Sequence, residues 1–443
     1  MIRLVSLVVL ILLFLLMAVI LFYPDYESPR IVRSLTIIVF MFLLSLAIFA
    51  EGHNLDFEKE HRTLFFVIVI LALAVRIIVL VGAEDKFYLS DDIYRYVWDG
   101  KVSAEGINPY KFAPLDDELE DLRDSAVHPH INFPHMRTIY PPVAQDFFLA
   151  AYKIGGGNII TFKLMFALFE VLTFFLLLKW LLIIGVKRAN LLLYLFSPLI
   201  LVEFYISAHL DILGIPFLIA ALISMEREKP LISGLLMACA SLVKFYGLFF
   251  VPFMFFHFKK WSRLAFLAAF IVFAAFLYLP YFVGMEFEVL GSLPAYLMEW
   301  HYYASAYDVL LNFFESETAR YIVWGAFGAL FILLLFIRMN VYQKMCAIFG
   351  GYVVLTPALF PWYLIWIYPF ILRNLSPAFW YLTGSILLSY NFMISVHDPG
   401  LWAGSWSENI YLRLACYIPF YLLLLWSAGR WIRSRIKQAQ SIS

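Results

Sequence analysis

The sequence is poor in charged residues. Asp, Glu, Lys and Arg make up 14% of its 443 residues, whereas a soluble domain of this size carries about 25%. Hydrophobic residues make up 63% and aromatic residues 19%, and the mean hydropathy is +0.85. So little charge cannot cover a water-soluble surface. The composition therefore excludes a soluble protein and predicts one that spans a membrane.

The sequence also lacks a net charge, and its cysteines show no metal-binding or disulfide pattern. The 32 Lys and Arg residues balance 32 Asp and Glu residues, so the charge gives no indication of a nucleic-acid partner. The three cysteines, Cys239, Cys346 and Cys416, lie in apolar stretches without metal-ligand spacing. We interpret them as buried hydrophobic side chains and expect no disulfide framework. The sequence shows no internal repeat and no low-complexity tract.

Apolar segments recur along the whole chain. The first, residues 2–22, has about the 20 residues that a bilayer span needs, and we expect a retained helix because no small-residue cleavage site follows it. Two pairs of short segments predict half-depth hairpins or broken helices, which need a covering of protein or a watery cavity. The sequence thus predicts an all-α polytopic membrane protein of about 12–14 hydrophobic segments. The expected segments are 2–22, 34–50, 64–83, 159–184, 191–207, 212–225, the pair 231–243 and 247–258, then 264–283, 321–338, the pair 345–358 and 361–372, and finally 378–395 and 410–430.

Basic residues in the short loops predict the orientation. If the N-terminus is cytoplasmic, most Lys and Arg residues of the short connections fall on the cytoplasmic side, as membrane proteins require. The C-terminus is then cytoplasmic as well. The long loop 84–158, with its 13 acidic residues, is predicted to lie outside, together with loops 284–320 and 396–409. We expect short interfacial helices within loop 84–158.

Two adjacent carboxylates, Asp91 and Asp92, stand near the start of that outer loop, just after Tyr88. In one interpretation Ser90 caps a short interfacial helix, both aspartates lie in its first turn, and Asp91 forms an exposed pair with Arg95. In the other, the carboxylates place a general base where a lipid headgroup meets an incoming hydroxyl. The residues alone leave both interpretations open.

Several further residues are candidates because of their setting. Tyr140 precedes two prolines, which mark a rigid turn that would hold the tyrosine in place. Glu203, His209 and Asp211 interrupt an apolar run, and a charged residue inside a span costs about 2.5–3.5 kcal/mol, so function is the default hypothesis. The alternative is an internal pair for Glu203 and a wet turn for the other two.

Two isolated cations and one aromatic break complete the set. Lys244 stands at the tip of the 231–258 hairpin and Arg76 lies two turns below the outer end of its segment; either would suit a lipid phosphate or simply snorkel to the interface. Trp362 and Tyr363, in Phe360-Pro361-Trp362-Tyr363, fit a sugar-stacking platform or an interfacial aromatic belt.

These features, in their order along the chain, resemble those of the GT-C superfamily of integral-membrane glycosyltransferases, which use polyprenyl-phosphate sugars. The likeness is greatest to bacterial polyprenol-phosphate-mannose-dependent mannosyltransferases and looser to the catalytic subunit of GPI mannosyltransferase I. It covers roughly residues 64–375 and depends on the order of motifs that are individually weak. The motifs are Asp91-Asp92-x-Tyr94, Trp98-Asp99-Gly100, Gly106-x-Asn108-Pro109-Tyr110, Tyr140-Pro141-Pro142, Glu203, His209-x-Asp211, Lys244 and Pro361-Trp362-Tyr363.

The chain departs from these relatives in three places. The GPI enzyme has Asp-x-Asp, whereas Asp91 and Asp92 are adjacent, which leaves open which carboxylate is the base. The acidic motif follows the third expected helix instead of the first. Phe360 stands where relatives often have His. We therefore expect two additional N-terminal helices in residues 1–63, a GT-C catalytic core in 64–283 and a C-terminal membrane part in 284–443.

The resemblance implies transfer of a hexose, with mannose expected, from a polyprenyl phosphate to a lipid-linked or glycan acceptor on the outer side, with inversion. Asp91, or second Asp92, would act as the base. Lys244, with Arg76 or Arg95, would bind the donor phosphate, whose single charge basic side chains can match. We expect no metal and no cofactor. The expected sugar or acceptor contacts are Asp211, His209, Tyr140, Glu203, Trp362 and Tyr363.

Two other kinds of function stay open. A transporter or flippase for lipid-linked sugars would share the embedded charges and broken helices, but it should show repeat symmetry and lack a large acidic outer loop. A non-catalytic membrane subunit is the second alternative. The expected partners are the polyprenyl-phosphate sugar donor, the acceptor and membrane lipids, with no nucleic acid. A bacterial inner membrane is the expected location.

Overall fold

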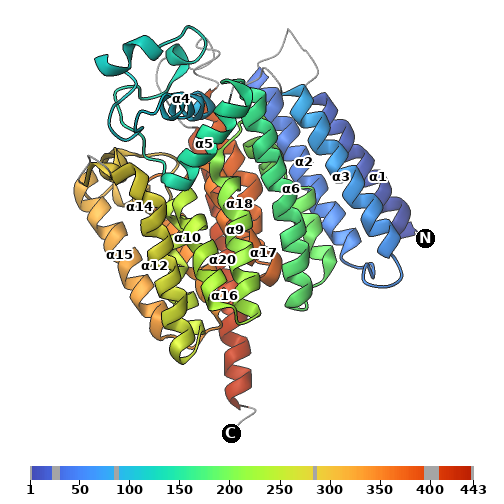
Figure 1. The fold of residues 1–443 in the computed structure, drawn as a ribbon. Coiled ribbons are helices and arrows are strands. Elements are labelled where there is room, and N and C mark those ends of the chain that lie inside the picture. Colours follow the sequence, from blue (N-terminus) through green and yellow to red (C-terminus); the bar gives the residue numbers. More distant parts are fainter. Residues whose placement is uncertain (1, 22–29, 84–88, 283–286, 394–408, 441–443) are drawn as a thin grey trace. The chain divides into compact units, whose positions relative to one another are not determined.

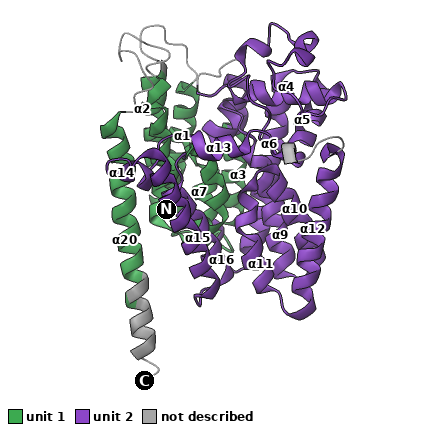
Figure 2. Cartoon of the chain, turned by 90° about the vertical axis from the view of Figure 1, so that its left-hand side faces the viewer, with its two compact units in different colours: residues 1–75, 189–199, 359–443 green, residues 76–188, 200–358 purple. Residues whose placement is uncertain are grey.

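The structure is a computed structural model of residues 1–443. It describes residues 2–21, 30–83, 89–282, 287–393 and 409–440, so Tyr88 and nearly all of the expected outer loop 396–409 lie outside the described residues. The chain forms two compact units (Figure 2). Unit 1 comprises residues 1–75, 189–199 and 359–443, and unit 2 comprises residues 76–188 and 200–358.

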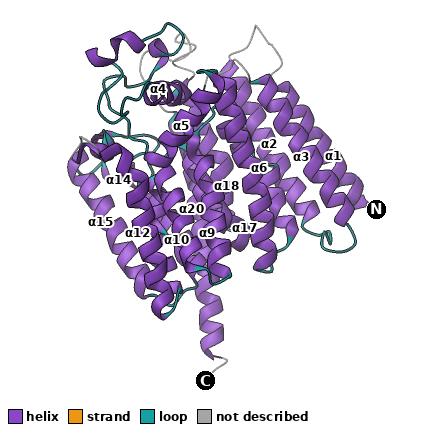
Figure 3. Cartoon of the chain, in the orientation of Figure 1, coloured by secondary structure: helices purple, strands orange, loops and turns teal. Residues whose placement is uncertain are grey.

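The described residues form helices and loops without a strand (Figure 3), apart from one isolated bridge between Tyr302 and Ala358. Seven helices are long and apolar enough to cross a membrane, or up to eight if one bent pair is a single span. The seven are Ile2–Ile20, Ile31–Gly52, Arg62–Gly82, Ile159–Ile183, Lys260–Phe282, Ser316–Phe336 and Ile410–Arg430. The predicted all-α polytopic membrane class is confirmed.

Unit 1 is built from both ends of the chain. Helices α2 and α18 contact each other through the rings of Phe42 and Trp380, which stack at 4.5 Å. Gly384 allows this approach, because a Cβ there would lie 2.1 Å from the Phe42 ring. The elements of unit 1 are α1 (Ile2–Ile20), α2 (Arg30–Gly52), the first two-thirds of α3 (Arg62–Gly82), α7 (Leu192–Leu195), α8 (Pro198–Ile200), η8 (Pro361–Ile367), α17 (Tyr368–Asn374), α18 (Pro377–Ser385), η9 (Ile386–Phe392) and α20 (Ile410–Gln440).

Unit 2 holds most of the polar candidate residues. Helix α10 packs on α9 and α12, and α5 packs on α4, α6 and α10. The elements are the end of α3, α4 (Asp92–Ala104), η1 (Asp117–Leu122), η2 (His128–His130), α5 (Pro142–Gly155), α6 (Ile159–Ile183), η4 (Leu201–Ile206), η5 (Leu210–Leu213), α9 (Gly214–Glu226), α10 (Pro230–Val243), η6 (Phe245–Phe249), α11 (Val251–His257), α12 (Lys260–Phe282), η7 (Phe287–Leu290), α13 (Leu293–Glu299), α14 (Ala306–Leu310), α15 (Ser316–Phe336) and α16 (Val341–Leu355). In the sequence, η3 (Arg188–Leu191) spans the division between unit 2 and unit 1 after residue 188.

Local signals explain where several of these helices begin. Pro142 and Pro230 stand at the first position of α5 and α10, where the missing N–H of proline costs nothing. Asn158 caps α6 by accepting a hydrogen bond from the backbone of Ile160, and Asn340 with Gln343 forms a capping box at α16.

The interruptions expected at the two short pairs are present. Lys244 has extended backbone and separates α10 from η6 and α11. Phe360, also extended, precedes η8 and α17. Two short helices, α4 and α5, lie in the expected outer loop, at one end of the unit 2 helices (Figure 1). The orientation in the membrane and the division at residues 63 and 283 stay predictions.

Candidate active site

The two adjacent aspartates stand at the start of α4. Asp91 is the N-cap residue and Asp92 is the first residue of the helix, where negative charge is favoured by the helix dipole. The Ser90 hydroxyl accepts a hydrogen bond from the Asp92 backbone at 3.3 Å. The pair that the first interpretation expected between Asp91 and Arg95 is wrong, because Arg95 instead donates to Asp99 at 2.9 Å.

Asn132 joins the two carboxylates. Its Nδ2 donates to Asp91 Oδ1 at 2.9 Å and to Asp92 Oδ1 at 2.7 Å. One amide group therefore holds two like charges side by side. Sequence reasoning missed Asn132, because an asparagine in a polar loop carries no distinguishing signal.

The protein around this pair raises the pKa of both carboxyl groups. Burial, with the charge of Asp91 added, raises the pKa of Asp92 to about 6, although the Asn132 hydrogen bond opposes the shift. Asp91 is exposed at the surface, yet loss of hydration raises its pKa as well, again against the Asn132 bond. Two neighbouring carboxylates with raised pKa values are suited to accepting a proton near neutral pH.

His209 connects Asp92 to the residues that interrupt the apolar run. Its Nε2 lies 3.0 Å from the Ser90 hydroxyl and 3.7 Å from Asp92 Oδ2. Its Nδ1 lies 2.9 Å from the Glu203 carboxylate, and its backbone N–H donates to the Glu203 carbonyl at 2.8 Å. His209 and Glu203 are both fully buried.

The local backbone explains this arrangement. Glu203 lies on η4, a π-helical turn, and such turns are frequent at functional sites because they re-aim side chains. Ala208 has a positive φ of 58° and turns the chain directly before His209.

Lys244 adds the cation of the cluster. Its Nζ lies 2.7 Å from Oδ2 of the fully buried Asp211 and 5.5 Å from the centre of the Tyr246 ring. The positive charge of Lys244 opposes the rise in the pKa of Asp92, so the two groups interact electrostatically. The break after α10 thus brings an ammonium group to Asp211, two residues after His209.

Arg76 lies elsewhere, in a buried ion pair. Its guanidinium donates to both oxygens of Glu170 at 2.9 and 2.8 Å, and the Tyr205 hydroxyl donates to the same carboxylate at 2.8 Å. Tyr205 shares η4 with Glu203, so this pair anchors the turn that carries Glu203. Glu170 was missed, although a charge inside the apolar segment 159–184 was a signal of the same kind as Glu203.

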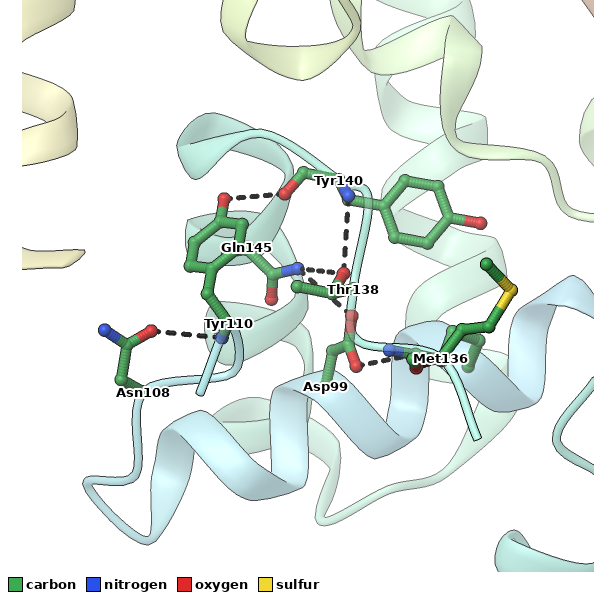
Figure 4. A network of polar contacts seen from close by, with 8 residues as sticks. Asp99, Asn108, Tyr110, Met136, Thr138, Tyr140 and Gln145 are labelled. Atoms are coloured by element: carbon green, nitrogen blue, oxygen red, sulfur yellow. Dashed lines mark hydrogen bonds and ion pairs between the residues drawn. The ribbon is translucent and has the colours of Figure 1, made fainter. Parts of the chain in front are cut away.

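A hydrogen-bond network connects α4 to neighbouring segments (Figure 4). Besides its bond to Asp99, Arg95 donates to the Met136 carbonyl at 2.9 Å. Gln145 on α5 donates to Asp99 Oδ2 at 3.1 Å and to the Thr138 hydroxyl at 2.9 Å. Asp99 and Arg95 are therefore bound within the protein, and they tie α4 to α5 and to the segment between them.

The same network fixes Tyr140. Its backbone N–H donates to Thr138 and its carbonyl accepts from the Tyr110 hydroxyl at 2.6 Å. Asn108 holds Tyr110 in turn by accepting from its backbone N–H. The Tyr140 ring points away from these bonds (Figure 4) and meets the Tyr96 ring edge-on at 5.2 Å. Burial, together with the negative charge of Asp92, raises the pKa of Tyr140 well above its ordinary value.

The remaining candidates belong to unit 1. Trp362 and Tyr363 lie on η8, with their rings edge-on at 5.8 Å, and Phe360 stacks on Trp362 at 4.6 Å. Unit 2 thus brings together Asp91, Asp92, His209, Glu203, Asp211 and Lys244, with Tyr140 near Asp92. Among the residues that the structure describes, no group of three or more His, Cys, Asp or Glu side chains is placed to hold a metal ion.

Comparison with known proteins adds one match. A family model described as alpha-(1->6)-mannopyranosyltransferase, N-terminal domain, matches residues 32–260, a stretch that contains every residue of the unit 2 cluster. A search of curated proteins finds no match to the chain.

Proposed function

Because the chain belongs to the alpha-(1->6)-mannopyranosyltransferase family, we propose that it transfers mannose from a polyprenyl-phosphate donor to a hydroxyl of a lipid-linked or glycan acceptor on the extracytoplasmic side of a bacterial inner membrane. The observation that carries this proposal is a set of linked contacts at the start of α4: Asn132 bridges the two carboxylates, His209 lies against Asp92, and Asp211, two residues after His209, holds the Lys244 ammonium. Such a site pairs a proton acceptor with a cation for a leaving phosphate.

In the proposed reaction the acceptor oxygen attacks the anomeric carbon while the bond from that carbon to the phosphate oxygen breaks. The hydroxyl proton passes to Asp91, which is exposed at the surface and so open to an acceptor. Asp92 is the second candidate for this role. The phosphate leaves as an anion and needs no proton, so one carboxylate suffices. Inversion to an α-linked product requires a β-linked donor.

Lys244 is the proposed partner of the donor phosphate. Asp211 holds its ammonium group from the buried side at 2.7 Å, while the Lys244 side chain keeps 18% of its surface exposed. Fixed charge that faces a developing anion stabilises it without reorganisation. Arg76 and Arg95 already have buried carboxylate partners, Glu170 and Asp99, so the proposal assigns them to positioning η4 and α4.

The sugar contacts follow from the same arrangement. His209 lies next to Asp92, and the charge of Asp92 acts on the Tyr140 hydroxyl. Both side chains would orient hydroxyl groups of the donor mannose. Asp211 and Glu203 would act mainly by holding Lys244 and His209. Trp362 and Tyr363 stay candidates for sugar stacking. We propose a reaction without a metal, since one ammonium group can match the single charge of the phosphate.

The test compares Asp91→Asn and Asp92→Asn with Asp146→Asn, a control whose exposed carboxylate on α5 pairs with Tyr281. The purified proteins are given synthetic polyprenyl-phosphate mannose and an α-1,6-linked oligomannoside. Replacing the base should lower kcat by about 10²–10⁴-fold, and the control should turn over normally. Full activity in both site variants would refute the assignment. Movement of labelled donor across the bilayer with its sugar bond intact would instead indicate a flippase.

A further inference from the structure

An aromatic cluster lies beside the two carboxylates, on residues that the proposed transfer does not use. The rings of Phe133 and Trp300 lie 4.7 Å apart at 59°, and Tyr296 lies 5.2 Å from Trp300 at 39°. The Phe133 ring is 46% exposed, and the other two rings are half-buried. The cluster therefore presents aromatic surface to the outside of unit 2.

Phe133 connects this cluster to the carboxylates. It directly follows Asn132, whose amide donates to both Asp91 and Asp92, and neighbouring Cα atoms lie about 3.8 Å apart. Phe133 is therefore one residue along the chain from the amide that bridges the two carboxylates.

The backbone of Phe133 is held in a conformation that the residue avoids. Its φ is 48°, in the left-handed region that a bulky residue adopts only where the surroundings impose it. The flanking residues impose it here: Met136 N–H donates to the Phe133 carbonyl at 3.0 Å, and Leu115 N–H donates to the Pro134 carbonyl at 3.0 Å. The ring thus stands out from a rigid turn.

Trp300 is fixed from the other side of the cluster. The buried Arg320 donates to the carbonyls of Leu297 and Trp300 at 3.3 and 3.0 Å, so it holds the end of α13. Gly291 brings the same loop onto Thr138, because its φ is +54° and a Cβ there would lie 1.8 Å from the Thr138 carbonyl oxygen. Two loops far apart in the sequence are thereby docked, with the aromatic rings between them.

We propose that Phe133, Trp300 and Tyr296 form an acceptor subsite that stacks on a neutral hexose ring of the acceptor glycan. A pyranose carries C–H groups on its faces and hydroxyls at its rim, and the electron-rich face of an aromatic ring attracts such C–H groups. An anionic lipid headgroup fits less well, because Asn132, the residue before Phe133, binds two carboxylates, and Glu299, the residue before Trp300, is exposed. This subsite rests on the proposed function, since it defines where the acceptor lies.

The experiment uses the full-length protein and an octyl glycoside of α-1,6-linked mannotriose. Phe133→Gly removes the ring while suiting the positive φ, so it should fold at least as well as the wild type. Trp300→Ala removes the second ring. Phe313→Ala, from the same outer loop and 76% exposed, is the matched control. Binding of the glycoside is measured without donor, and KM for donor and acceptor is measured with it.

Phe133→Gly and Trp300→Ala should each weaken glycoside binding and raise the acceptor KM by about tenfold. The donor KM and the kcat at saturating acceptor should stay within about twofold. Unchanged glycoside binding in both variants, or an equal loss in the control, overturns the subsite. If the wild type binds the glycoside but transfers no mannose to it, the proposed function fails while the binding result still tests the subsite.

Discussion

Asn132 provides a direct test of the acidic pair, through the variant Asn132→Ala. Its Nδ2 is the hydrogen-bond donor that Asp91 and Asp92 share, at 2.9 and 2.7 Å. These bonds favour the charged forms and so oppose the rise in the pKa of both carboxyl groups. The variant removes both bonds and leaves the two charges facing each other. The pKa values of the pair should therefore rise above those of the wild type.

The size of the shift follows from the energy of the lost bond. A hydrogen bond to a charged group contributes about 1.5–3 kcal/mol, and the lower end applies here because the site is partly open to solvent. One pKa unit corresponds to about 1.4 kcal/mol. The Asp92 side chain is 20% exposed and its pKa is raised to about 6. In the variant we expect the pair to titrate about one unit higher.

The assay is the pH dependence of kcat/KM for mannosyl transfer. The base works only when ionised, so activity is lost as the pH falls through its pKa. A higher pKa moves this loss to higher pH, so the acid limb of Asn132→Ala should lie about one pH unit above that of the wild type. The two carboxyls titrate together, so the limb reports the pair and not one residue.

Asn108→Ala is the matched control, because the Asn108 amide donates to the Tyr281 carbonyl, away from the aspartates. Its acid limb should stay at the wild-type position, whatever its maximal rate. An acid limb that does not move in Asn132→Ala, in a protein with unchanged thermal unfolding, would contradict the assignment of the pair as base. A shift to lower pH would contradict the sign of the argument.

Three further predictions concern the groups around the pair. Glu170→Gln should destabilise the protein by about 3–5 kcal/mol, because Arg76 then keeps a buried charge without its carboxylate; thermal unfolding in detergent measures it, and Arg76→Leu/Glu170→Leu should recover most of the loss. Lys244→Met should lower kcat/KM by about 10²–10³-fold through weaker donor binding, and Lys244→Arg should lower it less. A Lys244→Met protein as active as the wild type would exclude Lys244 as the phosphate partner. Donor affinity should rise as the pH falls toward about 6 and level off below, because the phosphate charge favours the protonated form of Asp92; donor titrations at several pH values measure this, and a flat profile counts against it.

Much of the fold is predictable from the sequence because membrane helices are a local signal. Each apolar segment can be recognised from its own composition. The breaks at Lys244 and Phe360 lie where polar residues or proline interrupt the apolar pattern. Candidate residues in apolar runs are predictable for the same reason, since a charge inside a span requires an explanation.

The sequence does not predict which of those charged residues form pairs. Arg76 and Glu170 are separated by 94 residues, and Lys244 and Asp211 by 33, so only the packing of the helices decides which cation meets which carboxylate. The sequence left Arg76 open as a phosphate ligand or a snorkelling side chain, and its partner Glu170 could not be predicted from the sequence. Asn132 is harder still, because a neutral amide in a polar loop is ordinary until the fold places it between two aspartates.

The charge balance of the site bears on why two carboxylates stand together. The Lys244 ammonium pairs with Asp211 and acts electrostatically on Asp92, and in the proposed reaction a bound donor adds one more negative charge. Like charges at this distance favour one proton on the pair. Asp92 is the partner more enclosed by protein, so the proposed mechanism places the proton there when donor is bound. Asp91 then stays ionised and exposed to the acceptor. In the proposed mechanism the adjacent carboxylates thus have separate roles: Asp92 is a neutral hydrogen-bond donor toward the sugar, and Asp91 is the base.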